Sequence, residues 1–218
     1  MEIIKVERGY LTILTGKTDM GKSTITVYEC GEDLKKGNRV AFFSYEYCQS
    51  VIYKKLTTHF QVGWSELLNL NIIDAAKLNL ATIVSTIRAK RESIDVVYID
   101  YLDLLKTTSY PTAKDEKENL VQIQEICKVL ADLAIELNIP IILLSQVGAS
   151  SDFEKTVERL NAFTEKVEAK NTIKMFIGKS NLIDSRIDFN DIVHIILVDG
   201  YNLKHFSSIN IKEIYGDK

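Results

Sequence analysis

Proline, cysteine and histidine are scarce in this chain, which has two prolines, three cysteines and three histidines among its 218 residues. Its ten glycines are spread along the sequence, which contains no low-complexity linker and no apparent internal repeat. We therefore expect a single domain over residues 1–218, long enough to bury a substantial core. Within this domain we expect a variable loop and helix region over 146–178 and C-terminal strands over 191–214.

The few cysteines and histidines are also dispersed, at Cys30, Cys48, Cys127, His59, His194 and His205. They contain no Cys-x-x-Cys pair and no metal-ligand spacing, so neither a disulfide framework nor a zinc cluster is indicated. We expect buried free thiols and structural histidines.

Two further absences concern location and charge. The sequence has no basic-plus-apolar leader and no apolar run long enough to span a bilayer, so we expect a cytoplasmic, intracellular protein, with a viral origin left open. The net charge of −3 argues against a uniformly basic surface for nucleic acid. A local basic strip stays compatible with this charge, because phosphate contact depends on where the charges lie.

A complete G-x-x-x-x-G-K-[ST] phosphate-binding motif lies near the N-terminus, from Gly16 to Ser23. The apolar run Leu11–Leu14 predicts a strand that enters this loop, and residues 24–29 predict a helix that leaves it. The alternative, a glycine-rich turn that binds nothing, is disfavoured by this strand, loop and helix context.

The residue types in the motif suit the binding of phosphate. Gly16 and Gly21 let consecutive backbone N–H groups turn toward phosphate oxygens, and the following helix adds its positive dipole end. Lys22 would neutralise the β- and γ-phosphates, and the Ser23 hydroxyl would hold Mg²⁺. The expected nucleotide-binding residues are Gly16, Lys17, Thr18, Asp19, Met20, Gly21, Lys22, Ser23 and Thr24. Those at the variable positions of the motif have no expected catalytic role.

A carboxylate follows the next predicted strand, residues 39–44, at Glu46. Ligands bind beyond the carboxyl ends of strands in open α/β sheets, so Glu46 is a candidate to orient or deprotonate an attacking water. For an isolated glutamate, the alternative is an exposed residue at the start of a helix.

The apolar strand within residues 94–103 ends at Asp100, as in a Walker B motif. Asp100 would hold Mg²⁺ beside Ser23. Asp95 precedes the strand, and Asp103, which follows it, is a secondary candidate. A strand-ending aspartate alone is a weak signal, since it can serve only as a turn or a cap.

A further strand, residues 141–144, is followed by Ser145 and Gln146. The amide of Gln146 is a candidate sensor of the γ-phosphate, with a capped strand end as the alternative. The remaining expected elements are a turn over 31–37, a helix over 47–60, helix in 64–70, a strand over 71–74, a helix over 78–91, a polar loop over 106–119 and a helix over 115–138.

Residues 151–170 predict a charged amphipathic helix that starts with a capping box. Its basic residues are offset by acidic ones almost one for one, so a solvated helix or subunit contact is as good an interpretation as a DNA-binding strip. A strand or turn over 175–178, a strand over 191–198 and an edge hairpin partner over 206–214 complete the chain. Trp64 is a candidate to stack on a base, although packing in the core or at its edge is the favoured interpretation.

The phosphate loop, Glu46, Asp100 and Gln146 together resemble the RecA-like ATPase core, and especially the motor domain of DnaB-type replicative helicases. The segment at 43–47, Phe-Ser-Tyr-Glu-Tyr, resembles that family's Phe-Ser-Leu-Glu-Met, whose glutamate is the catalytic base. The segments at 99–105 and 144–146 resemble its Ile-Asp-Tyr-Leu-Gln-Leu-Met and Leu-Ser-Gln motifs, and 189–193 is more loosely similar to a further one. The resemblance implies an α/β fold with a mostly parallel central sheet flanked by helices; a C-terminal edge hairpin is expected with it.

Two departures from the family pattern qualify this expectation. DnaB-type helicases carry an N-terminal helical domain, for which we expect no room here, and a C-terminal Lys-x-Arg pair that reaches the neighbouring subunit's nucleotide. The last arginine of this chain is Arg186, and the lysines after it are Lys204, Lys212 and Lys218. Lysine does not reproduce the arginine fork, so a processive hexameric helicase is in question.

The expected function is ATP binding and Mg²⁺-dependent hydrolysis by a RecA- or DnaB-like motor acting on single-stranded DNA in replication or recombination. We expect a homo-oligomer, either a hexameric ring or a filament, with replication or recombination proteins as further partners and no membrane association. The alternative is a nucleotide-switched assembly or loader protein without helicase activity. A P-loop kinase is disfavoured by Glu46 and Gln146.

Overall fold

The computed structural model describes residues 8–16, 22–100, 105–107, 116–146, 172–179, 192–199 and 202–210. Its elements are β1 (Leu11–Gly16), α1 (Lys22–Lys35), β2 (Val40–Ser44), α2 (Gln49–Thr58), α3 (Trp64–Leu67), β3 (Leu70–Asp74), α4 (Leu80–Ala89), the 3₁₀ turn η1 (Arg91–Ser93), β4 (Val96–Asp100), α5 (Glu116–Leu137), β5 (Ile141–Gln146), β6 (Thr172–Lys179), β7 (Ile192–Asp199) and β8 (Asn202–Asn210).

The strands form one sheet in the order β3-β2-β4-β5-β1-β6-β7-β8. The first five strands of this order are mutually parallel, and β6, β7 and β8 pair antiparallel. The carboxyl ends of β1 to β5 therefore meet at one edge of the sheet, and the predicted α/β fold with a mostly parallel central sheet is confirmed for this part of the chain.

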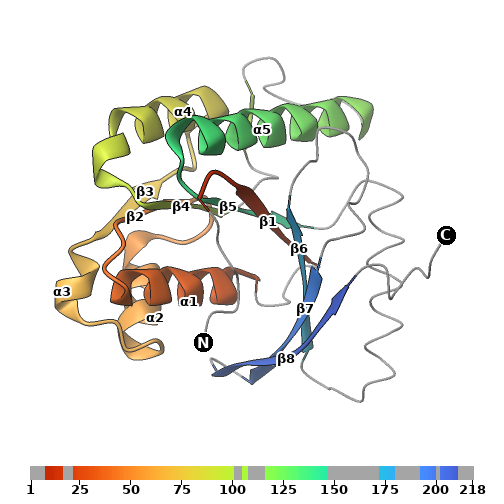
Figure 1. Ribbon diagram of the computed structural model, residues 1–218. Coiled ribbons are helices and arrows are strands. Elements are labelled where there is room, and N and C mark those ends of the chain that lie inside the picture. Colours follow the sequence, from red (N-terminus) through yellow and green to blue (C-terminus); the bar gives the residue numbers. More distant parts are fainter. Residues whose placement is uncertain are drawn as a thin grey trace.

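Helices cover both faces of the parallel strands, with α1, α2 and α3 on one side and α4 and α5 on the other (Figure 1). Each side has its own buried cluster. Phe42 and Tyr98 belong to the cluster that includes α1 and α2, whereas Phe43 and Ile99 belong to the one that includes α4 and α5. Every residue of β2 and β4 is buried, which explains why these strands are nearly continuous apolar runs.

Helix α1 continues through Gly31 to Lys35, so the turn predicted over 31–37 is wrong for residues 31–35. A glycine suits this helical position because α1 passes close to Leu56 of α2 and to Val62. A Cβ on Gly31 would lie 3.1 Å from Val62 Cγ2 and 3.3 Å from Leu56 Cδ2. The turn comes at Gly37, whose φ of +83° favours glycine and whose N–H donates to the Leu34 carbonyl.

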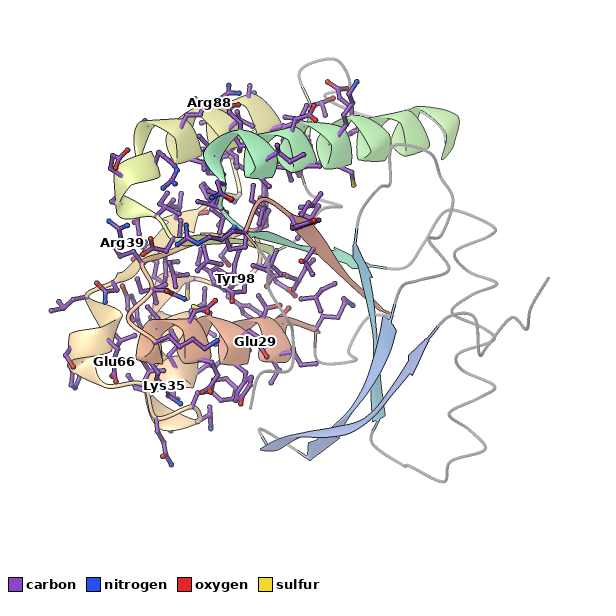
Figure 2. The ribbon with its side chains drawn as sticks, in the orientation of Figure 1. Glu29, Lys35, Arg39, Glu66, Arg88 and Tyr98 are labelled. Carbon is purple, nitrogen blue, oxygen red and sulfur yellow. The ribbon has the colours of Figure 1, made fainter. Side chains whose placement is uncertain are left out.

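A buried hydrogen bond ties α1 to the middle of the sheet. The Tyr98 hydroxyl donates to Asp33 Oδ2 at 2.6 Å, and the Asn38 side-chain amide donates to Asp33 Oδ1 at 3.1 Å. Tyr98 projects from the sheet toward the helical layer of α1 (Figure 2). This contact helps to fix the position of α1, whose first residues are Lys22 and Ser23.

Two interpretations of single side chains are wrong. Cys30 and Cys127 are buried as predicted, but Cys48 is exposed because it lies in the N-cap position of α2. Trp64 is 80% exposed, so it does not pack in the core. Its position at the first residue of the short helix α3 leaves its ring outside the buried cluster.

Several predicted features lie outside the described residues. They are Lys17 to Gly21 of the phosphate loop, Asp103, most of the polar loop over 106–119, the helix over 151–170 and residues 189–191. Within the described part of the chain, no helix is long and apolar enough to cross a membrane.

The close approach at Gly31 can be tested by adding volume. Because a Cβ there already meets Val62 and Leu56, we expect Gly31→Val to lower the free energy of unfolding by about 1–3 kcal/mol through overpacking. Denaturant titration followed by circular dichroism measures the change. Lys35→Val, at an exposed site of the same helix, is the matched control. If both variants lose the same stability, the tight contact is not the cause.

Candidate nucleotide-binding site

The sheet brings the predicted site residues to one edge. Gly16 at the end of β1 is in register with Gln146 at the end of β5. Ser44 at the end of β2 is in register with Asp100 at the end of β4, and the Tyr45 N–H donates to the Asp100 carbonyl at 2.8 Å. The backbone of these four strand ends thus supports the shared location that the motifs predict.

The structure describes the first residue of the phosphate motif and its last two. After Gly16, the structure continues at Lys22 and Ser23, the first residues of α1. Lys22 is buried, Ser23 is half-buried, and the Thr26 hydroxyl donates back to the Lys22 carbonyl. The Lys22 ammonium lies close enough to Asp100 to lower the pKa of its carboxyl. The N-terminal end of α1 and the Lys22 side chain therefore lie at the edge of the sheet where the parallel strands end.

Asp100 is a buried acidic residue at this edge. Its side chain is 1% exposed, and neither carboxylate oxygen accepts a hydrogen bond of acceptable geometry within the described structure. Burial raises its pKa to about 6, which the nearby Ser23 hydroxyl partly offsets and the charge of Glu46 reinforces. A buried carboxylate without a partner is costly, so it indicates a ligand with positive charge.

The donor set around Asp100 suits Mg²⁺. The carboxylate and the Ser23 hydroxyl are hard oxygen donors, and Mg²⁺ takes one or two protein oxygens while phosphates and waters complete its shell. Among the described residues, no group of three or more histidine, cysteine or acidic side chains could hold a metal by itself. Ser23 and Asp100 thus fit a nucleotide-bound Mg²⁺ better than a free-standing protein metal centre.

Glu46 lies in a short turn whose backbone is held at both ends. The Ser44 hydroxyl donates to the Tyr47 carbonyl at 2.8 Å, and the Tyr47 N–H donates to Ser44 Oγ at 3.1 Å. The Glu46 side chain itself is exposed, and its charge raises the pKa of Asp100. Because α2 begins only at Gln49, Glu46 is not the first residue of a helix.

Asp95 lies away from this site, at the opposite edge of the sheet. It precedes β4, and there Arg39 Nε and Nη2 each donate to one of its carboxylate oxygens at 2.8 Å. These bonds hold the pKa of Asp95 down at about 2. The ion pair with Arg39 gives Asp95 a structural role.

For Gln146, the structure describes only the backbone, which pairs with Gly16. Lys55 of α2 is not predicted at this edge from the sequence, yet its charge interacts with both Asp100 and Glu46. Nothing in its sequence context separates it from an ordinary surface lysine, since another lysine precedes it. Only the packing of α2 against the sheet brings it near the acidic pair.

The strand order and helical layers define a RecA-like α/β fold, and solved structures agree. One solved ATPase domain has a TM-score of 0.63 at 19% identity, and the match covers 92% of this chain and 86% of that one. A DnaB-like replicative helicase has a TM-score of 0.59 at 20% identity, with 94% of this chain and 55% of that one covered. The RadB recombinase has a TM-score of 0.59 at 14% identity and covers 93% of each chain. At these identities, the likeness concerns the fold.

Sequence relatives point to one family. Residues 59–159 match the model of the DnaB-like helicase C-terminal domain. A probable plasmid replicative DNA helicase of Chlamydia psittaci is 25% identical over 171 residues, which are 66% of this chain and 36% of that protein. The replicative DNA helicase DnaB of Rickettsia bellii is 26% identical over 215 residues, which are 81% of this chain and 42% of that protein.

Residues 59–159 of this chain are thus similar to the DnaB-like helicase C-terminal domain, and the chain has distant relatives named replicative DNA helicase DnaB and a RecA-like fold, as the resemblance of its motifs predicts. The chain matches less than half the length of these two curated relatives.

The unpartnered carboxylate predicts a stability that falls with rising pH. Because the folded-state pKa of Asp100 is about 6, above its ordinary 3.8, the folded protein binds this proton more tightly than the unfolded chain does. The contribution of Asp100 to the free energy of unfolding is fully present below about pH 4 and is lost as the pH rises through the folded-state pKa. We expect Asp100→Asn to be more stable than the wild type by roughly 2 kcal/mol at pH 7.5, without nucleotide and in EDTA.

Urea titrations at pH 7.5 and pH 4.5 measure this difference, which should shrink at the lower pH. Asp132→Asn, an exposed acid on α5, is the control and should change little at either pH. A variant at Asp100 that is less stable than the wild type at pH 7.5 would show that the carboxylate has a partner in the folded protein.

Proposed function

We propose that this chain is a Mg²⁺-dependent ATPase of the DnaB-like motor type that acts on single-stranded DNA in replication or recombination. The buried Asp100 carboxylate, which lacks a hydrogen-bond partner in the described structure and lies near Ser23, Lys22 and Glu46, is the observation that best supports it. We further propose that residues 1–218 form one ATPase domain and that the chain works as a homo-oligomer.

In this proposal, the phosphate loop from Gly16 to Ser23, with Thr24, holds the ATP phosphates. Lys22 at the start of α1 neutralises the β- and γ-phosphates. Ser23 and Asp100 hold the Mg²⁺ that, when bound, neutralises charge on the phosphate oxygens. The burial of Asp100 favours this role, because a cation compensates a carboxylate that otherwise has no hydrogen-bond partner among the described residues.

Glu46 is the proposed general base. Hydrolysis joins a water oxygen to the γ-phosphorus, breaks the bond to the oxygen that bridges to the β-phosphate, and releases a proton from the attacking water. The exposed Glu46 carboxylate, in a turn fixed by Ser44 and Tyr47, is suited to accept that proton. Gln146, in register with Gly16 of the phosphate motif, is the proposed γ-phosphate sensor.

Single-stranded DNA is proposed because curated relatives are named replicative DNA helicases. A DNA motor should hydrolyse ATP faster when single-stranded DNA is present, whereas a nucleotide-switched assembly or loader protein should not need it. ATPase rates with and without DNA, and the mass of the particle with and without ATP, separate these two functions.

The role of Glu46 gives the most direct test. We expect Glu46→Gln to lower kcat for ATP hydrolysis by about 100-fold or more while the Kd for ATP changes by less than about threefold, because only proton transfer is lost. Phosphate release and the binding of a fluorescent ATP analogue measure the two quantities. Glu92→Gln, an exposed acid in η1, is the matched control. Unchanged turnover in Glu46→Gln would remove Glu46 from the mechanism.

A further inference from the structure

Lys55 is a cation of α2 whose charge acts on the two acidic residues of the proposed ATPase site. Its neighbour Leu56 and Ile52, one turn earlier, are fully buried in the core, so the helix face next to Lys55 is turned toward the sheet. Lys55 is itself half-buried, in contrast to the exposed Lys54. A half-buried lysine packs its methylene stem against apolar residues and keeps its ammonium among polar or aromatic groups, so the neighbours of the Lys55 ammonium are of interest.

An aromatic ring fixes the end of the Lys55 side chain. The Lys55 ammonium lies 4.1 Å from the centre of the Tyr47 ring, a distance typical of a cation–π contact. Tyr47 is held in turn by Ser44, whose hydroxyl bonds to both the N–H and the carbonyl of Tyr47. One short segment therefore carries Glu46 and also supplies the ring against which Lys55 rests.

The charges around Lys55 are negative and favour its protonated form. Burial lowers the pKa of Lys55, while the carboxylates of Asp100 and Glu46 raise it. The Lys55 ammonium in turn lowers the pKa of Asp100. Asp100 and Glu46 repel each other, and the positive charge of Lys55, which acts on both carboxylates, reduces this repulsion.

We propose that Lys55 is a positioning residue for Glu46: held against the Tyr47 ring, its ammonium keeps the Glu46 carboxylate in place beside Asp100 for hydrolysis. This inference rests on the proposed function of Glu46 as the base. Lys55 contributes little to nucleotide affinity, because Lys22 is the lysine of the phosphate motif. Its contribution lies in the geometry and charge of the acidic pair, which a small displacement of a base would impair.

The test compares Lys55→Met and Lys55→Arg with the matched control Lys54→Met in the full chain. We expect Lys55→Met to lower kcat for ATP hydrolysis by about tenfold with KM and Kd for ATP within about threefold of the wild type. Lys55→Arg, which keeps the charge and the contact with the ring, should recover most of the lost rate. Lys54→Met should leave all three constants unchanged.

Three results would overturn the inference. An increase in Kd for ATP as large as the fall in kcat would assign Lys55 to phosphate binding, and an unchanged kcat would assign it no role in turnover. Lys55→Met added to Glu46→Gln should cause no further loss of rate, because a positioning residue acts only through the base it positions. A second tenfold loss in that background would also contradict the inference.

The failure of the proposed function would look different. If the wild-type chain hydrolyses no ATP, or if Glu46→Gln hydrolyses it normally, the function proposed for Glu46 fails. The interaction of Lys55 with Glu46 is then decided by a double-mutant cycle on Tm at low ionic strength. Shifts of Glu46→Gln and Lys55→Met that deviate from additivity by more than about 1 °C support the pairing, and additive shifts overturn it.

Discussion

The burial of the Asp100 carboxylate is the constraint on which the rest of this structure depends. Strand β4 is apolar and fully buried, and its last residue places two charged oxygens at the end of a hydrophobic layer without a hydrogen-bond partner in the described structure. Such a group is tolerated only because the remaining structure is stable enough to hold it. The two buried clusters and the bond between Tyr98 and Asp33 supply part of that stability.

Groups that favour the ionised carboxylate come from two helices. Lys22 comes from the start of α1 and Lys55 from the last turn of α2, and the Ser23 hydroxyl adds a polar group beside Lys22. Glu46 adds a second negative charge from the turn after β2. The site is therefore a balance of charges from separate parts of the chain, which the parallel sheet brings together because all its carboxyl ends share one edge.

The sequence predicts the elements and the motif residues well, since both depend on local patterns. Buried strands such as β2 and β4 are continuous apolar runs, and the fixed motif positions carry their own chemistry. Gly31 and Lys55 are misjudged or missed because their surroundings come from other segments. A glycine in a helix and a glycine in a turn look alike until Val62 and Leu56 are seen beside it. A second lysine after Lys54 is equally uninformative until α2 is packed on the sheet.

The two edges of the parallel sheet have opposite characters. At the edge where β2 and β4 begin, Arg39 and Asp95 satisfy each other with several hydrogen bonds. At the other edge, Asp100 has no hydrogen-bond partner among the described residues. Substitutions at the first edge should thus lower the amount of folded protein. Substitutions at the second edge should instead change the activity of a protein that still folds. A selection that scores only the amount of folded protein would count changes of the first group as losses and would not detect a loss of activity in the second.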